Sequence, residues 1–500
     1  MNPFALVIFG ASGDLTKRKL LPALYTLYTN GRLPEPFSVV GVARTGYTDD
    51  EFRAYALEQL RHFVPASQQD EDRIAAFVSR LHYQPLDPSQ AEGYADLRTK
   101  LQAVTGEAQP DNLLFYLSTP PLLYGVVPLH LKSVGLNTPG SRIIVEKPFG
   151  YDLQSALELG RVYESVFEER QIYRIDHFLG KETAQNLLAF RFANAIFEPV
   201  WNRNYIDYVE VTAVENLGIE NRGGFYETAG ALRDMVQNHL IQLVALTAME
   251  PPAVFNADSF RNEVVKVYES LRPLSESDLR EHIIRGQYTA TDRHKAYREE
   301  KGVDPDSRTE TFVAMRLNID NWRWSGVPFY IRTGKQMPTK VTEIVVHFRE
   351  TPHQMFRCAE GAACPPQPNQ LILRIQPNEG AVLKVGMKVP GAGFGVKRVT
   401  MDFDYGQLGD APITDGYARL IDDCIQGDPT LFTRNDAVEA SWRFFDPVLN
   451  FWQTSPDASL FGYPAGTWGP RESDRLMTEH GADWTNPCKN LTNTDLYCEL

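Results

Sequence analysis

The sequence predicts an α/β protein with two domains: an N-terminal doubly wound parallel sheet and a larger α+β domain with a mainly antiparallel sheet. The chain has 500 residues, more than one hydrophobic core usually serves. Its N-terminal part alternates short apolar runs with helical segments, which favours a parallel sheet. After about residue 180, strand-like runs follow one another with few helices between them, which favours antiparallel pairing. We therefore expect domains at 1–180 and 181–500.

The N-terminal strands are short apolar runs. ALVIFG, residues 5–10, ends in glycine, the pattern of a buried parallel strand. The helical segment KRKLLPALYTLYTNG follows, and Pro22 should kink or restart it because proline lacks the amide donor of a continuous helix. Later runs have the same character, and we expect further strands in FSVVGVAR (37–44), NLLFYLST (112–119) and SRIIVEKPFG (141–150).

The second part is rich in β-branched and aromatic residues, as strands are. We expect helices at 231–250 and around 433–453. The expected strands are DYVEVTAVENLGI (207–219), TETFVAMRLNID (309–320), PFYIRTGK (328–335), VTEIVVHFRE (341–350), LILRIQPNE (371–379) and AVLKVGMKVP (381–390).

Composition excludes several classes of partner. The net charge of −14 argues against general binding to nucleic acid or to anionic membranes, although it leaves room for a local basic pocket. No apolar stretch approaches the roughly 18–20 residues that span a bilayer, and MNPFALVIFG does not resemble a secretory signal. Five widely spaced cysteines form neither a disulfide framework nor a zinc pattern. We therefore expect a reduced, cytoplasmic protein and no metal site.

A glycine turn follows the first expected strand. In GASGDL, Gly10 and Gly13 let the backbone approach a pyrophosphate, and the next helix offers free N–H groups. Arg44 ends the second expected strand, where a Rossmann-type fold reads the adenosine ribose, and no acid follows until Asp49. An arginine there favours the 2′-phosphate of NADP, with NAD as a weaker alternative. The competing interpretations are an ordinary turn and a solvated arginine.

Two polar segments follow later strands. Lys147, in EKPFG, closes one strand at the end where doubly wound folds bind ligands. In RIDHFLGKE (174–182), His177 and Lys181 would share a face and could hold a phosphate if the chain becomes helical there. Asp176 could orient an imidazole from elsewhere in the fold. An ordinary surface or core pair stays open for Asp176 and His177.

The apolar helix ALRDMVQNHLIQ is interrupted by polar residues. Asp234 and Asn238 share a helical face, and His239 lies about 140° around from Asp234 by the helical period. Polar groups among leucine, valine and methionine need partners, so they either satisfy one another in the core or line a site. Cations and a carboxylate also stand at strand ends elsewhere in this part of the chain, namely Glu215, Lys335 and Lys340.

Five segments together carry a resemblance. GASGDL, EKPFG, RIDHFLGKE, DMVQNHLIQ and RTGK, in this order and spacing, resemble the glucose-6-phosphate dehydrogenase family over essentially the whole chain. The resemblance implies oxidation of D-glucose 6-phosphate at C1 to 6-phospho-D-glucono-1,5-lactone, with hydride transfer to NADP+, the first step of the oxidative pentose phosphate pathway. It also implies a homodimer or homotetramer.

The resemblance assigns roles to individual residues. His239 would be the general base at the C1 hydroxyl, and Asp176 the carboxylate that orients it. His177, Lys181 and Lys340 would bind the 6-phosphate. The sugar ring would be held by Glu215, Asp234 and Lys335, and Lys147 would bridge sugar and nicotinamide. The coenzyme site would comprise Gly10, Ser12, Gly13, Asp14, Leu15, Lys147 and Arg44.

One departure and several alternatives stay open. The family usually has tyrosine where this chain has Phe178, whose missing hydroxyl predicts a weaker KM for the sugar phosphate. An NAD(P)-dependent oxidoreductase of an unphosphorylated sugar and a non-catalytic NADP sensor are the rival functions. A second, structural NADP site occurs in the C-terminal domain of some relatives, and the sequence does not decide it here.

Overall fold

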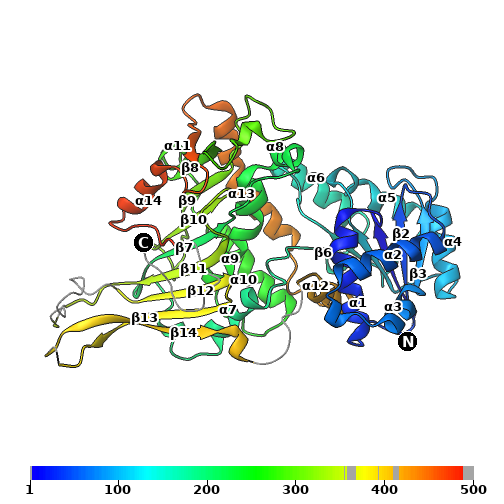
Figure 1. Ribbon diagram of the computed structural model, residues 1–500, viewed down its shortest axis with the longest axis horizontal. Helices are drawn as coiled ribbons and strands as arrows, with labels where there is room; N and C mark the ends of the chain where they lie inside the picture. Colours follow the sequence, from blue (N-terminus) through cyan, green and yellow to red (C-terminus); the bar gives the residue numbers. More distant parts are fainter. Residues whose placement is uncertain (1–2, 354, 357–367, 392, 409–415, 488–500) are drawn as a thin grey trace. The chain divides into compact units, whose positions relative to one another are not determined.

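The computed structural model describes residues 3–353, 355–356, 368–391, 393–408 and 416–487. The chain divides into two compact units (Figure 1). The first comprises Met1–Glu182, Ala253–Arg261 and Ile413–Glu439; the second comprises Thr183–Pro252, Asn262–Pro412 and Ala440–Leu500. The expected domain boundary at residue 180 stays a prediction. Two short segments from far along the chain belong to the first unit.

The first unit contains a six-stranded parallel sheet in the order β3-β2-β1-β4-β5-β6. This strand order is that of doubly wound dinucleotide-binding folds, in which the chain reverses direction across the sheet beside β1. The prediction of a parallel doubly wound sheet is therefore confirmed. Its strands are β1 (Phe4–Phe9), β2 (Phe37–Ala43), β3 (Leu81–Pro85), β4 (Leu113–Leu117), β5 (Arg142–Val145) and β6 (Ile172–Arg174).

The helices of the first unit begin with a restart at Pro22. A π-helix, η1 (Thr16–Leu20), leads into α1 (Leu21–Thr29), where Pro22 stands in the first turn and needs no amide partner. Arg32, after α1, donates to Asp422 of α12 (2.9 Å), which ties that late helix to the first unit. The remaining helices are α2 (Asp49–Phe63), α3 (Glu71–Val78), α4 (Tyr94–Thr105), α5 (Val126–Ser133), α6 (Leu153–Glu164) and α12 (Gly416–Gln426).

The second unit is built on a nine-stranded mixed sheet in the order β14-β13-β12-β11-β7-β10-β9-β8-β15. Two strand pairs, β7 with β10 and β8 with β15, are parallel, and the others are antiparallel. The expected mainly antiparallel sheet is confirmed. Its strands are β7 (Ile206–Val214), β8 (Ile283–Thr289), β9 (Phe312–Asn318), β10 (Pro328–Gly334), β11 (Val341–Phe348), β12 (Gln370–Gln376), β13 (Gly380–Lys388), β14 (Val396–Asp404) and β15 (Phe461–Pro464).

The helical segment predicted at 231–250 is helical, but its first part is a π-helix. α8 (Gly223–Ala231) is followed by η6 (Leu232–Leu240) and then by α9 (Ile241–Ala248). Because π-helices bond residue i to i+5, residues five apart lie about one turn apart. The expected separation of about 140° between Asp234 and His239 is therefore wrong, since it assumed the α-helical period. The two side chains share one face of η6.

The other helices are α7 (Glu182–Phe192), α10 (Ala257–Glu269), α11 (Glu276–Glu281), α13 (Asn435–Thr454) and α14 (Arg475–Thr478). The short helices η2 (Ala66–Gln68), η3 (Pro121–Leu123), η4 (Glu169–Gln171), η5 (Glu198–Val200), η7 (Tyr297–Glu299), η8 (Tyr405–Leu408) and η9 (Arg471–Asp474) lie in connections. Among the residues described, no helix is long and apolar enough to cross a membrane. Cys424 is buried as a free thiol; the other cysteines, Cys358, Cys364, Cys488 and Cys498, lie outside the described residues.

Candidate active site

The glycine turn lies directly beyond β1, in the first unit. Gly10 has φ +85°, and an added Cβ would lie 1.9 Å from the carbonyl oxygen of Ser118. The turn closes through the amide of Gly13, which donates to the Gly10 carbonyl (2.9 Å), and the Thr16 hydroxyl donates to the same oxygen (3.0 Å). Leu15 leads into η1. The turn is thus closed tightly on itself and packed against Ser118. Pyrophosphate binding at this turn stays a prediction.

The end of β2 lies beside this turn. Thr45 donates its hydroxyl hydrogen to the Ser12 hydroxyl (3.3 Å), and Arg44, one residue earlier, is exposed. The structure therefore brings Ser12 and Arg44 to one edge of the parallel sheet. Asp14 is exposed, and its carboxylate accepts from Arg18 (2.9 Å) and pairs with Lys17 (3.1 Å) in the following helix.

Lys147 and Asp176 follow two adjacent parallel strands. β5 and β6 pair with Val145 opposite Arg174, so the segments after them leave the same edge of the sheet. The Lys147–Pro148 peptide is cis. Asp176 is 3% exposed, and its carboxylate accepts from the backbone N–H of Phe178 (2.9 Å). This hydrogen bond orients the carboxylate at the edge of the sheet where the parallel strands end.

Residues 177–181 form turns rather than a helix. The amide of Leu179 donates to the Asp176 carbonyl (3.0 Å), the amide of Lys181 donates to the Phe178 carbonyl (3.2 Å), and α7 begins only at Glu182. His177 and Lys181 therefore do not lie on one face of a helix, because the chain is not helical between them. Their placement comes from Phe178, because its ring lies 4.5 Å from the Lys181 ammonium and 5.1 Å from the His177 ring.

The start of α12, far away in the sequence, contacts this segment at two points. The Tyr417 ring of α12 stacks on His177, with centroids 6.4 Å apart and planes 11° apart. Gly180 packs against the start of α12, since a Cβ there would lie 2.7 Å from the Gly416 carbonyl oxygen. Sequence reasoning missed Tyr417, and nothing in its local pattern indicates this role.

Glu146 carries a partly buried carboxyl group beside Lys147. The Tyr116 hydroxyl of β4 donates to it, and Tyr116 is fully buried. Burial raises the pKa of Glu146 to about 7, and the nearby Asp176 charge adds to the rise, while Tyr116 and Lys147 act against it. Sequence reasoning gave Glu146 no role, although the strand-end position was a signal for one.

The second unit gathers three predicted residues at one edge of its sheet. Glu215 follows β7, Lys335 follows β10, and Lys340 precedes β11. Because β7 and β10 are parallel and β11 is antiparallel to β7, all three lie at one edge. Lys335 forms an ion pair with Glu215, and its side chain is 3% exposed, whereas Lys340 is exposed.

The π-helix η6 contacts both β7 and β10 and carries the remaining predicted residues. His239 is 1% exposed and Asp234 is 9% exposed. The middle of η6 is anchored to α13, where the Ser441 hydroxyl donates to the Gln237 carbonyl (3.1 Å) and accepts from the Gln237 amide (3.3 Å). The lysine–glutamate pair and the imidazole therefore belong to neighbouring elements of one unit.

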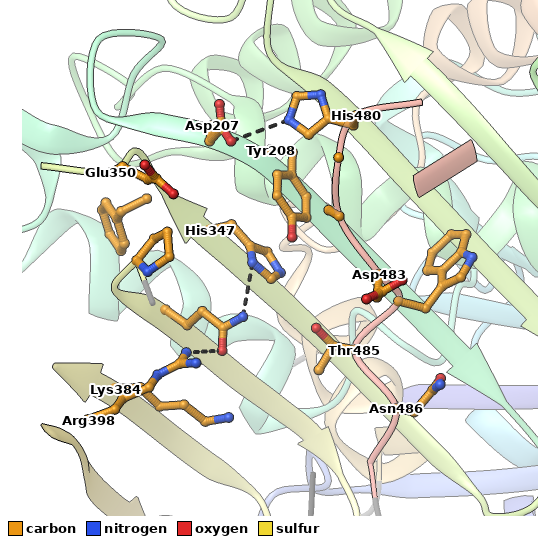
Figure 2. A pocket seen from close by; sticks show the side chains of 16 residues that line it. Asp207, Tyr208, His347, Glu350, Lys384, Arg398, His480, Asp483, Thr485 and Asn486 are labelled. Atoms are coloured by element: carbon orange, nitrogen blue, oxygen red, sulfur yellow. Dashed lines mark hydrogen bonds and ion pairs between the residues drawn. The ribbon is translucent and has the colours of Figure 1, made fainter. Parts of the chain in front are cut away.

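A separate cavity of about 550 Å³ lies in the second unit, away from these residues (Figure 2). Lys384 and Arg398 stand at one side, and Tyr208 stacks on His347 with centroids 3.9 Å apart. Buried Glu210 accepts from His347 (2.7 Å) and Thr485 (2.7 Å), which holds the C-terminal segment on the sheet. The lining also includes Asp207, Phe348, Glu350, Pro368, Gln370, His480, Gly481, Ala482, Asp483, Trp484 and Asn486.

The first unit thus presents a glycine turn after β1 and the side chains of Lys147, Asp176, His177 and Lys181 after β5 and β6. The second presents an imidazole, carboxylates and lysines. An imidazole suits removal of a proton from an alcohol near neutral pH, and a dinucleotide fold suits hydride transfer. This combination defines the class of nicotinamide-dependent dehydrogenases.

The family is set by sequence comparison. The family described as glucose-6-phosphate dehydrogenase, NAD binding domain, matches residues 7–186, and the one described as glucose-6-phosphate dehydrogenase, C-terminal domain, matches residues 188–485. The chain belongs to the glucose-6-phosphate dehydrogenase family.

Individual relatives are similar over their full length. A glucose-6-phosphate 1-dehydrogenase of Aggregatibacter actinomycetemcomitans is 50% identical over 96% of this chain and 97% of the relative. One from Treponema pallidum is 46% identical over 100% and 98%. A solved glucose-6-phosphate dehydrogenase in complex with its substrate glucose-6-phosphate superposes with a TM-score of 0.88 at 35% identity, covering 97% of this chain and 99% of that chain.

Proposed function

We propose that this chain oxidises D-glucose 6-phosphate at C1 to 6-phospho-D-glucono-1,5-lactone and passes the hydride to NADP+. One observation carries the proposal: residues 176–181 place a buried, oriented carboxylate, an imidazole and an ammonium group within one turn segment at a strand end. Such a segment suits a substrate that has a proton to lose at one end and a phosphate at the other.

In this proposal, His239 removes the proton of the C1 hydroxyl while the nicotinamide accepts the hydride. An imidazole with an ordinary pKa near 6.5 suits the proton transfer, and a carboxylate partner would stabilise its charged form. Asp176 is the proposed partner, and the fixed orientation of its carboxylate supports that role. Oxidation of the hemiacetal to the lactone then needs no further reactant.

The remaining residues bind and orient. We assign the 6-phosphate to His177, Lys181 and Lys340, because charge-assisted hydrogen bonds favour a dianion. Lys335, Glu215 and Asp234 offer both donors and acceptors for the sugar hydroxyls, and the ion pair between Lys335 and Glu215 supports a shared task. Lys147 would contact sugar and nicotinamide, and the coenzyme would lie along Gly10, Ser12, Gly13, Asp14, Leu15 and Arg44.

The test is reduction of NADP+ by the purified protein with glucose 6-phosphate or glucose. His239→Asn should lower kcat by about 10²–10⁴-fold while glucose 6-phosphate still binds, because the lost group acts in proton transfer. His282→Asn is the matched control, since His282 pairs with Asp278 (2.8 Å) in a connection outside the site. Turnover of glucose alone would favour the unphosphorylated-sugar enzyme, and tight NADP binding without turnover would favour a sensor.

The cavity of Figure 2 is our proposed place for a second, non-catalytic NADP. Lys384 and Arg398 suit phosphate, and the aromatic rings of Tyr208 and Trp484 in the cavity lining suit contact with a base or nicotinamide ring. Equilibrium binding should give two NADP per chain. A Lys384→Ala/Arg398→Ala double variant should give one and keep its kcat, whereas one NADP per wild-type chain would exclude the site.

We also propose that the chain forms a homodimer or homotetramer through β13 and β14. On one face of this pair, the alternating residues are apolar and partly or largely exposed: Leu383, Val385, Met387, Val399, Met401 and Phe403. An apolar strand face that is exposed to water marks an interaction site, and most soluble oligomers form by symmetric contact between identical chains.

A cytoplasmic location stays a prediction.

A further inference from the structure

Glu310 holds the start of the π-helix η6 from outside the helix through two hydrogen bonds. The amide of Ala231 donates to the Glu310 carbonyl (3.0 Å), and the amide of Leu232 donates to the Glu310 carboxylate (3.0 Å). Helix N-termini leave several amides without intrahelical partners, and side chains that accept from them act as caps. Glu310 therefore caps η6 although it lies 78 positions away along the chain.

The backbone before η6 fits this cap closely. Gly230 has φ +62° and ψ 175°, a conformation that only glycine adopts readily, and it breaks the path between α8 and η6. An added Cβ at Gly230 would lie 2.3 Å from the Glu310 carboxylate oxygen. Glu310 itself is 5% exposed, so its contact with η6 is shielded from water.

The next residue, Thr311, ties the same point to the sugar-binding edge. Its carbonyl accepts from the amide of Lys335 (2.9 Å), and its hydroxyl lies 3.0 Å from the hydroxyl of Tyr463. The Tyr463 hydroxyl in turn donates to the Lys335 carbonyl (2.7 Å). Glu310 and Thr311 thus form one connection between the helix that bears His239 and the strand end that bears Lys335.

We propose that Glu310 is a positioning residue for His239: its carboxylate keeps residues 232–240 in the π-helical form and so sets the direction of the imidazole relative to Lys335 and Glu215. π-Helices are rare and occur mostly as short turns at functional sites. Without the cap, relaxation to the α-helical period would rotate His239 around the helix axis, away from the face it shares with Asp234.

The chemistry of the carboxyl group agrees with a capping role. Burial raises the pKa of Glu310, and the hydrogen bond from Leu232 acts against that rise. The oxygen that accepts from Leu232 is present in either protonation state. The cap therefore requires a side-chain acceptor oxygen at the length of the glutamate side chain and does not require a negative charge. Substitution by glutamine or by aspartate separates these two properties.

The test compares Glu310→Gln with Glu310→Asp. Glutamine keeps an acceptor oxygen at the same reach, so its kcat should stay within about threefold of the wild type. Aspartate keeps the charge but is one methylene shorter, so its kcat should fall about tenfold or more, with the KM for NADP unchanged, because small misplacements of a catalytic group are costly. kcat is measured per folded molecule at a temperature well below the unfolding midpoint.

Glu198→Asp provides the structural control. Glu198 pairs with Arg191 (3.2 Å) and Arg323 (2.8 Å) in the same unit, outside the site, so this change should lower the unfolding midpoint and leave kcat alone. Equal activity of both Glu310 variants, or a Gln variant as impaired as the Asp variant, would overturn the proposal. The proposal rests on His239 as the base, and the His239→Asn variant tests that assumption separately.

Discussion

The apolar ring of Phe178 packs against two polar residues of the segment 176–181. Its ring lies under the Lys181 ammonium at 4.5 Å, a cation–π distance, and next to His177. The sequence drew attention to Phe178 because the family usually has tyrosine there, so this chain lacks a phenolic hydroxyl at that position. The structure adds its packing: the buried Phe178 ring contacts both His177 and Lys181.

Phe178→Tyr should tighten substrate binding. A neutral hydrogen bond to the phosphate contributes roughly 0.5–1.5 kcal/mol, so the KM for glucose 6-phosphate should fall about two- to tenfold with kcat unchanged. Steady-state kinetics measure this directly. Phe178→Leu is the control, since it removes the ring from Lys181 and should raise the KM instead. An unchanged or higher KM in the tyrosine variant would rule out the missing hydroxyl as a determinant.

Arg44 should select the coenzyme. Arg44→Ala removes a charge-assisted contact with the 2′-phosphate, which contributes about 1.5–3 kcal/mol, so the KM for NADP should rise about ten- to a hundredfold. The KM for NAD should stay unchanged because NAD lacks that phosphate. Arg53→Ala, whose guanidinium donates to the Leu81 carbonyl (2.9 Å), serves as the control. Equal losses with both coenzymes would assign Arg44 a structural role.

Glu146 should make stability depend on pH. Its folded pKa of about 7 exceeds the ordinary value of 4.5, so the folded protein retains this proton while the unfolded chain releases it. This group therefore costs nothing below about pH 4.5, destabilises the fold progressively as pH rises toward 7, and imposes the full penalty of about 3 kcal/mol above that.

Glu146→Gln removes the titration and keeps the size of the side chain. Thermal denaturation in matched buffers gives the unfolding midpoint of the variant minus that of the wild type. This difference should be more positive at pH 8 than at pH 5.5. Because both proteins share all other titrating groups, the difference isolates Glu146. A difference that does not change with pH would mean that Glu146 stays ionised throughout.

At the scale of elements, the turn after β1 brings residue 10 close to the Ser118 carbonyl, and only glycine fits at that position. Gly10→Ala would combine strain at φ +85° with a Cβ 1.9 Å from the Ser118 carbonyl oxygen. We expect the free energy of unfolding to fall by about 1–3 kcal/mol from strain alone, and the KM for NADP to rise at least tenfold.

Gly31→Ala is the matched control for the turn. Gly31 also has positive φ, +67°, but nothing lies within 4 Å of an added Cβ. Its substitution should cost stability through strain and leave the KM for NADP alone. If both variants changed the KM equally, the effect would come from general destabilisation and not from the shape of the turn.

Sequence periodicity predicted the elements well where one face or one run is buried. The apolar runs gave β1, β2, β4 and β5, and Pro22 marked the restart of α1. Periodicity could not reveal that residues 232–240 are π-helical, because their polar and apolar spacing fits an α-helix about as well. The contacts that hold η6 come from elsewhere in the chain, from Glu310 and Ser441, and no local pattern connects either residue to η6.

The candidate site shows the same division between local and distant information. Asp176, Lys147 and Glu215 follow strands, and strand ends are readable from sequence. Tyr417 and Glu310 act through contacts with residues far away in the chain, and neither stands in a motif. Motifs therefore predicted residues for substrate contact, which stay predictions, and missed the distant contacts made by Tyr417 and Glu310.

At the scale of the whole molecule, the sheet of the second unit ends in strands whose apolar face is not covered. Met401 and Phe403 of β14 are 45% and 60% exposed, and Met387 of β13 is 52% exposed. A chain with a net charge of −14 keeps like molecules apart at long range, so an apolar contact must supply the attraction at short range.

A Met401→Asp/Phe403→Asp double variant should therefore dissociate the oligomer. Two carboxylates placed on each copy would meet their own counterparts across a symmetric contact, where desolvation and like-charge repulsion both oppose association. Light scattering during size-exclusion chromatography should give the monomer mass, against a multiple of it for wild type. Trp322→Asp is the control, because Trp322 is 97% exposed but lies in a connection outside this strand face, and its variant should keep the wild-type mass. An unchanged mass for the double variant would place the subunit contact on another surface.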